Sequence, residues 1–197
     1  HALHLVTGDG RIGAALVADA RVAGIAFTGS TAVAQNINRT PAGKDGPIVP
    51  FIAETGGINA MIADATALPE QICDDVITSA FRSAGQRCSA LRLLFVQDDV
   101  ADRMIEMIAG AARELVVGDP GDPATHIGPV IDTEAKQRLD AHIARMKQEA
   151  KVHFAGTAPA GNFVAPHIFE LSDAGQLKEE VFGPVLVAVP FDDIEDA

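Results

Sequence analysis

The stretch Gly24-Ile-Ala-Phe-Thr-Gly-Ser-Thr31 carries the first clear signature of the fold. Its apolar half, 24–27, predicts a buried strand, and the polar residues that follow predict a sharp turn. Ser30 or Thr31 is placed to cap a helix whose apolar face would begin at Val33. The stretch therefore indicates a strand that leads directly into a helix.

The same alternation of strand and helix extends on both sides of this stretch. A short apolar run at 3–6 predicts a strand, and the spacing of Ile12 and Leu16 predicts a helix after it. The proline- and glycine-containing residues 41–47 predict a loop before another apolar strand at 48–53. Two rounds of strand and helix are typical of a parallel sheet, so we expect an α/β fold.

The pattern changes at the pair Gly56-Gly57, which we take as a domain boundary between residues 1–55 and 56–197. Helical spacing recurs later along the chain, between short apolar runs. The second domain is thus expected to be α/β as well. Its predicted helices span 68–84, 100–115 and 135–146, and its predicted strands span 60–63, 91–96, 152–154, 163–165 and 185–189.

Composition excludes several classes of protein. The 197 residues carry a formal charge of −12, which argues against a nucleic-acid surface or an anionic membrane as partner. Two cysteines do not make a disulfide framework, and no apolar stretch is as long as a membrane span. We expect a cytoplasmic protein. The chain opens without Met inside a predicted strand and closes just after another, so we expect a fragment truncated at both ends.

Two glycine-containing turns are candidate phosphate sites. The sequence Gly8-Asp-Gly-Arg-Ile-Gly13 matches the G-x-G-x-x-G pattern of dinucleotide-binding turns, but Thr28 stands where an acidic ribose ligand is expected. A lone match of this kind is weak evidence, and a tight strand-to-helix turn is the favoured explanation. Gly29 and Ser30 make a better anion site, because a helix N-terminus follows them; an ordinary helix cap is the alternative.

The two cysteines lie in different surroundings. Cys88 lies among small residues between a predicted helix and a predicted strand, with Arg87 beside it. A thiol there can be exposed and reactive, whereas a free cysteine is more often a small buried hydrophobe. Cys73 fits that second description, because it lies beside Ile72 in an amphipathic helix. The pattern favours one reactive and one structural cysteine.

Carboxylates mark two further candidate positions. Glu54 ends the apolar strand 48–53 and precedes two glycines, so partial burial there would suit a general base; a solvated strand end is the alternative. Glu180 and Phe182 lie in 178–184, a segment that is also consistent with a solvated turn. The six histidines show no metal-ligand spacing, so no metal site is expected.

Four of these motifs, in this order, resemble the aldehyde dehydrogenase superfamily. They are Phe27-Thr-Gly-Ser30, Glu54-x-Gly-Gly57, Gly85-Gln-Arg-Cys88 and Glu180-Val-Phe-Gly-Pro184. The resemblance covers essentially the whole chain, which would be less than half of a complete enzyme. It implies the end of a Rossmann-like NAD-binding domain over 1–55 and an incomplete catalytic domain over 56–197.

Three longer segments are similar to one branch of the superfamily. They are 53–60, 81–90 and 127–132, and they resemble the glutamate-γ-semialdehyde (pyrroline-5-carboxylate) dehydrogenase module of bifunctional proline-utilization enzymes. Two departures from the wider family, Thr55 and Ala34, suit this branch. A dehydrogenase for another aldehyde, or a non-catalytic domain that serves assembly, are the alternatives.

The resemblance also implies roles for individual residues. Cys88 would attack the aldehyde, and Glu54 would activate the water that hydrolyses the resulting thioester. The remaining roles concern binding. Gly29 and Ser30 would face the NAD phosphates, Glu180 would hold the nicotinamide ribose, Phe182 would pack nearby, and Ser89 would contact the substrate.

The same resemblance places several partners outside this chain. An oxyanion-hole asparagine and a cofactor-binding lysine would precede it, and a substrate loop and a dimer-forming strand would follow it. The isolated fragment is therefore expected to be nearly inactive. The full-length enzyme would be a homo-oligomer, joined to an upstream FAD-dependent proline dehydrogenase domain and peripheral at the inner membrane.

Overall fold

The computed structural model describes residues 2–195 and 197, which form two compact units. The first unit is His1–Gly56 and the second is Gly57–Ala197.

The first unit is built on two parallel strands. Strand β1 (Ile25–Thr28) pairs with β2 (Phe51–Glu54) in a register that sets Thr28 opposite Glu54. Helices α1 (Gly10–Ala18) and α2 (Thr31–Ala42) pack against each other beside these strands. The strand–helix–strand order predicted from residues 24–54 is present, and the parallel pairing follows from it.

Two local predictions in the first unit are wrong. Residues 3–6 form no strand in the described chain: Leu3 and Leu5 are 91% and 90% exposed, and no neighbouring strand pairs with them. A strand needs such a partner for its backbone groups. The loop predicted at 41–47 begins later, because Pro41 lies inside the last turn of α2 and Gly43 caps that helix.

The second unit is a five-stranded sheet in the order β3-β4-β7-β6-β5. All neighbouring strands are parallel except the antiparallel pair of β5 and β6. The α/β fold class with mainly parallel sheets is thus confirmed. The strands are β3 (Asn59–Ala63), β4 (Leu91–Gln97), β5 (Lys151–Ala155), β6 (His167–Glu170) and β7 (Val185–Phe191).

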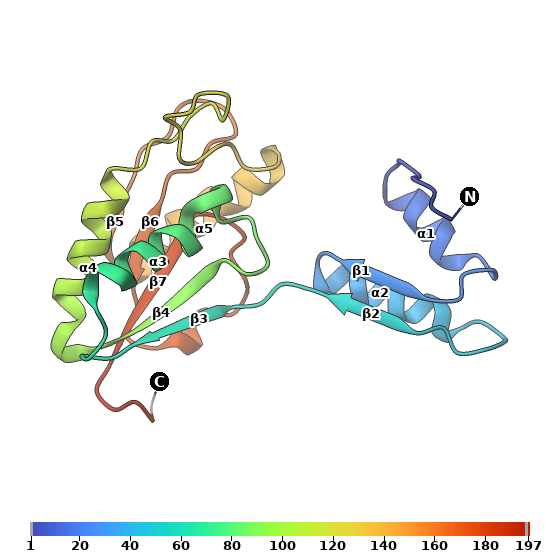
Figure 1. The fold of residues 1–197 in the computed structure, drawn as a ribbon, viewed down its shortest axis with the longest axis horizontal. Helices are drawn as coiled ribbons and strands as arrows, with labels where there is room; N and C mark the ends of the chain where they lie inside the picture. Colours follow the sequence, from blue (N-terminus) through green and yellow to red (C-terminus); the bar gives the residue numbers. More distant parts are fainter. Residues whose placement is uncertain (1, 196) are drawn as a thin grey trace. The chain divides into compact units, whose positions relative to one another are not determined.

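Helices cover both faces of this sheet (Figure 1). Helices α3 (Pro69–Phe81) and α4 (Asp98–Arg113) pack against each other on one face. Helix α5 (Thr133–Glu149) lies on the other face, and the short helices η1 (Arg82–Gly85) and η2 (Ala174–Gln176) lie in loops. Central strands β4 and β7 are apolar and almost fully buried, as strands covered on both faces must be.

Two boundaries in the second unit differ from the prediction. The strand predicted at 163–165 is wrong: the ladder begins after Pro166, at His167, whose N–H donates to the Pro184 carbonyl. Proline cannot donate to a ladder, which explains why the strand begins after it. The helix predicted over 68–84 ends at Phe81, where the chain turns sharply into η1.

The sheet order positions the candidate site. Strands β4 and β7 are parallel neighbours, so the residues that precede them meet at the same edge of the sheet. The segment before β4 contains Cys88, and the segment before β7 contains Glu180 and Phe182. The topology thus brings together two motifs that are about ninety residues apart in the chain.

Candidate active site

In the first unit, the candidate residues lie at the carboxyl ends of β1 and β2. Glu54 is the last residue of β2, and its carbonyl accepts a hydrogen bond of 3.1 Å from the Gly29 N–H. Gly29, Ser30 and Glu54 are therefore neighbours at this edge. The Glu54 side chain is exposed, so the predicted partial burial is not found; no element of the first unit covers the end of this edge strand.

Ser30 caps helix α2, as predicted. Its Oγ accepts a hydrogen bond from the Val33 N–H at 3.4 Å. The first backbone N–H groups of a helix have no partner within the helix and carry a partial positive charge. A side chain at Gly29, just before the cap residue, would displace the Phe27 ring, so glycine suits this position. The turn therefore leaves backbone N–H groups that can bind an anion.

The glycines of the turn at 8–13 have different functions. Asp9 caps α1 by accepting a hydrogen bond from the Arg11 N–H, and a Cβ at Gly8 would collide with Ile12. This part is a tight capped turn rather than a phosphate cradle. Gly10 and Gly13 instead border open space, because a Cβ at either would meet nothing within 4 Å.

That open space is an apolar cavity of about 570 Å³ between α1, β1 and α2. Gly13 and Ala14 line it from α1, and Val33 and Ile37 line it from α2. The absence of side chains at Gly10 and Gly13 keeps the cavity open. Its walls can accept a flat apolar group such as a nucleobase.

In the second unit, Cys88 lies in a strained loop between η1 and β4. Ser83, Ala84 and Gly85 all have positive φ, at 56°, 52° and 64°. Non-glycine residues rarely adopt this conformation, and strained backbone of this kind is concentrated at functional sites. The chain reverses here and leaves Cys88 and Ser89 exposed at the amino edge of the sheet.

Several side-chain hydrogen bonds fix this loop to neighbouring segments. Asn59 Nδ2 donates to the carbonyls of Cys88 and Ala90, at 2.7 and 2.9 Å. The Gln86 Oε1 accepts a hydrogen bond from the Ile131 N–H at 2.9 Å. The Arg87 side chain donates to the carbonyls of Thr78 and Ser79 in the last turn of α3, where a cation is favourable. The backbone around Cys88 is thus fixed while its thiol remains accessible.

Glu180 and Phe182 contact this loop through a side chain that the sequence analysis did not single out. Arg92 is 1% exposed and donates hydrogen bonds to the carbonyls of both Gly85 and Gly183. Its guanidinium also lies 3.7 Å from Glu180 Oε1 and 5.5 Å from the centre of the Phe182 ring. A lone arginine in an apolar buried strand must be paired, and that rule could have identified it.

The two cysteines differ as expected. Cys73 is 6% exposed in α3, with its Sγ 3.8 Å from the Met107 carbonyl. Burial raises the pKa of the Cys73 thiol, and the Asp74 carboxylate raises it further. Cys73 is therefore a structural residue held as the thiol, whereas Cys88 is free and exposed.

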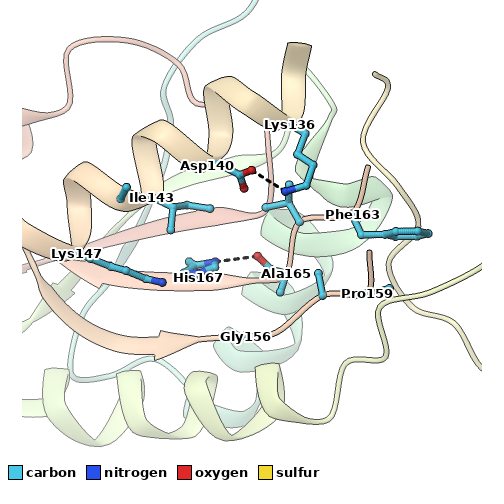
Figure 2. A pocket seen from close by; sticks show the side chains of 12 residues that line it. Lys136, Asp140, Ile143, Lys147, Gly156, Pro159, Phe163, Ala165 and His167 are labelled. Atoms are coloured by element: carbon cyan, nitrogen blue, oxygen red, sulfur yellow. Dashed lines mark hydrogen bonds and ion pairs between the residues drawn. The ribbon is translucent and has the colours of Figure 1, made fainter. Parts of the chain in front are cut away.

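A second cavity in this unit, of about 370 Å³, lies between α5 and residues 156–167 (Figure 2). The ion pair of Lys136 and Asp140 borders it, and so does the buried ring of His167. Burial lowers the pKa of His167, although its contact with the Ala165 carbonyl acts in the opposite direction. Neither cysteine lines this cavity, so it is not the candidate active site.

The described residues, 2–195 and 197, contain no group of three or more His, Cys, Asp or Glu side chains suited to a metal ion. Within the same residues, no helix has the length and apolar character needed to cross a membrane.

Gly85 offers a direct test of the strained loop. The variant Gly85→Ala combines an unfavourable positive φ with a Cβ that would overlap the Gly183 backbone, so the loop must shift. A shift of about 1 Å at a reacting group can cost about 100-fold in rate, and we expect that loss in kcat/KM. Gly110→Ala, inside α4 with no atom closer than 4.0 Å, is the matched control. It should retain full activity; an active Gly85→Ala enzyme would contradict the prediction.

The mainly parallel α/β fold and the exposed Cys88 on its fixed loop define a domain that bears a reactive thiol. Comparison with known sequences identifies its family. The whole chain, residues 1–197, matches the aldehyde dehydrogenase family. The chain belongs to this family, as the four motifs predicted. It is 46% identical over 202 residues to the bifunctional protein PutA of Escherichia coli K12, and 48% identical over 207 residues to that of Rhizobium meliloti. These alignments cover 96% and 98% of the chain but 15% and 17% of the PutA proteins.

Solved structures of relatives have the same fold. A mutant proline utilization A protein of Bradyrhizobium japonicum is 77% identical, with a TM-score of 0.96 over 99% of this chain and 20% of that one. The 1-pyrroline-5-carboxylate dehydrogenase from Thermus with bound NAD is 31% identical, with a TM-score of 0.87. That alignment covers 96% of this chain and 38% of the Thermus chain. The predicted resemblance to the proline-utilization branch is thus confirmed.

Proposed function

We propose that this chain is part of an enzyme that oxidises L-glutamate γ-semialdehyde, formed from pyrroline-5-carboxylate, to L-glutamate in proline catabolism, with NAD⁺ as oxidant. The observation that carries the proposal is the exposed thiol of Cys88 on a strained loop. Hydrogen bonds from Arg92 tie this loop to the segment that contains Glu180 and Phe182. The names of the related proteins, PutA and 1-pyrroline-5-carboxylate dehydrogenase, support the choice of substrate.

The first unit fits the proposed cofactor. Its apolar cavity suits an adenine ring, and Gly10 and Gly13 leave room that a Cβ would fill. At the adjacent carboxyl edge, the backbone after Gly29 and Ser30 offers N–H groups to the phosphates. In the second unit, Glu180 Oε1 is buried without a hydrogen-bond partner among the described residues, which suits a ligand hydroxyl from the nicotinamide ribose. Phe182, 42% exposed, would pack against the same part of the cofactor.

The chemistry assigned to this chain begins at Cys88. Its thiolate Sγ adds to the aldehyde carbon and forms a thiohemiacetal, and Ser89 beside it would contact the substrate. The thiohemiacetal carbon would lose a hydride, for which bound NAD⁺ would be the acceptor, and its hydroxyl would lose a proton, so that a thioester would remain on Cys88. Glu54 takes a proton from the water that attacks the thioester, and the Cys88 thiolate departs as the carboxylate product forms. Thioester formation needs a soft nucleophile, which is Cys88. Hydrolysis of the thioester needs a separate base that activates water, which is Glu54.

The remaining assignments concern the longer enzyme of which this chain would be a part. The PutA relatives are named as bifunctional proteins, and we assign FAD to a proline dehydrogenase domain in the same polypeptide. We also assign residues 1–55 to the NAD-binding domain and 56–197 to the catalytic domain. We expect the enzyme to be a cytoplasmic homo-oligomer.

The test of the proposed function is a substrate comparison with the complete enzyme. NADH formation is measured with glutamate γ-semialdehyde, with a shorter unsubstituted aldehyde, and with NADP⁺ in place of NAD⁺. We expect glutamate γ-semialdehyde to be preferred by at least about 100-fold in kcat/KM, because the site would pair with its charged groups. Preference for the unsubstituted aldehyde would favour another dehydrogenase, and no turnover with any aldehyde would favour a non-catalytic domain.

A further inference from the structure

Arg92 is a buried charge that the proposed chemistry does not use. It lies in β4 between Leu91 and Leu93, and only 1% of its surface is exposed. Burial lowers the pKa of its guanidinium, although the Glu180 carboxylate counteracts that effect. A buried cation is costly unless several partners compensate it, so its partners indicate what it does there.

Those partners lie on two separate segments at the amino edge of the sheet. Nη2 donates to the carbonyls of Gly85 and Arg87, at 2.6 and 3.2 Å, on the loop that carries Cys88. Nη1 donates to the carbonyl of Gly183 at 2.8 Å, on the segment that carries Glu180 and Phe182. A single planar side chain thus links the nucleophile loop to the second segment.

The linked loop is one that needs support. Ser83 and Ala84 have positive φ, and such residues persist only where the surrounding structure fixes them. Gly85, which continues the same left-handed turn, directs its carbonyl to Arg92. Without the guanidinium, this carbonyl would lose its 2.6 Å hydrogen bond and the turn would lose one of its restraints.

The second segment retains the capacity to bind a ligand. Glu180 Oε1 is buried and has no hydrogen-bond partner among the described residues, although it lies 3.7 Å from Arg92 Nη2. Arg92 Nε is also buried without a partner. The ion pair therefore orients the carboxylate without using its hydrogen-bonding capacity, and a ligand at Glu180 would alter the group that Arg92 faces.

We propose that Arg92 is a positioning residue that couples occupation of Glu180 by the cofactor to the placement of the Cys88 loop. This inference rests on the proposed function, since it takes NAD⁺ as the ligand of Glu180. A ligand on the carboxylate changes the ion pair, and the same guanidinium transmits that change through Gly85 and Arg87. The nucleophile is thereby set in its reactive position when the oxidant is present.

The test compares wild type with Arg92→Gln, Arg92→Lys and the surface control Arg138→Gln in the complete enzyme. Arg138 lies on α5 with its side chain 73% exposed. Alkylation of Cys88 by iodoacetamide is followed by mass spectrometry with and without saturating NAD⁺, after NAD⁺ binding to each protein has been measured by titration. Wild type and Arg138→Gln should show an NAD⁺-dependent change in rate of about fivefold or more. Arg92→Gln should show none, and its kcat/KM should fall by about 100-fold.

Arg92→Lys keeps the positive charge but replaces the planar fork with a compact ammonium. It should fold even if Arg92→Gln does not, and it should retain at most part of the response to NAD⁺. A full response in Arg92→Lys or Arg92→Gln would overturn the proposal, and so would a wild-type enzyme that binds NAD⁺ with no change at Cys88. Because alkylation requires no turnover, failure of wild type to oxidise glutamate γ-semialdehyde would refute the proposed function and leave this readout intact.

Discussion

Replacement of Cys88 by serine in the complete enzyme is expected to reduce kcat by on the order of 10⁴–10⁶-fold. Serine keeps the shape of the side chain, but its hydroxyl is a poor nucleophile without an adjacent base. The structure places no His side chain in the loop at 82–90 that could act as such a base. Turnover is measured as NADH formation with glutamate γ-semialdehyde, and the Kd of NAD⁺ should stay within about twofold of wild type, because the thiol itself is not a cofactor ligand.

The matched control is Cys73→Ala. Cys73 is buried in α3, outside the loop at 82–90, and its substitution removes only a small apolar group. A loss of about 1 kcal/mol in the free energy of unfolding is expected, with kcat unchanged. If Cys88→Ser kept activity within about tenfold of wild type, or if Cys73→Ala were the inactive variant, the assignment of the nucleophile would be wrong.

Local sequence predicted the local structure around several candidate residues, because each motif specifies its own turn. Ser30 caps α2 in the structure, as a serine before an amphipathic helix should. The exposed Cys88 and the buried Cys73 follow from the same kind of reasoning about neighbouring residues.

The features that sequence did not predict depend on contacts between distant segments. The link between Gly85 and Gly183 through Arg92 needs the order of β4 and β7 in the sheet, which no local pattern reveals. No strand forms at 163–165. Strand β6 begins only after Pro166, and it contains the polar residues His167 and Glu170. An amphipathic pattern cannot show that a histidine will be buried against α5.

The position of Cys88 also differs from the usual arrangement of open α/β sheets. In such sheets, ligands bind beyond the carboxyl ends of the strands. Glu54 and Gly29 follow this rule in the first unit, since they lie at the carboxyl ends of β1 and β2. Cys88 and Glu180 lie instead before β4 and β7, at the amino edge. The general rule therefore fits the candidate residues of the first unit, and only the motifs pointed to those of the second unit.

Replacement of Glu54 by glutamine should separate the two halves of the proposed reaction. Glutamine has the same shape but cannot take a proton from water, so steady-state turnover should fall by about 10²–10⁴-fold. Thioester formation requires Cys88 and the oxidant rather than this base. Rapid mixing with NAD⁺ and glutamate γ-semialdehyde should therefore still give a burst of about one NADH per active site.

Mass spectrometry of the acid-quenched variant gives the second readout. The glutamyl acyl group should accumulate on Cys88, which is the only exposed cysteine among the described residues. Glu106→Gln, an exposed carboxylate on α4, is the matched control and should turn over like wild type without accumulating the acyl group.

The burst decides which step needs Glu54. A burst followed by slow turnover places the carboxylate in hydrolysis, where the exposed position of Glu54 in the first unit gives water access to it. Loss of the burst together with turnover would instead place Glu54 before the thioester, as the base that deprotonates the Cys88 thiol. An unchanged steady state would remove Glu54 from the mechanism altogether, and its place at the end of β2 would then be that of an ordinary solvated strand end.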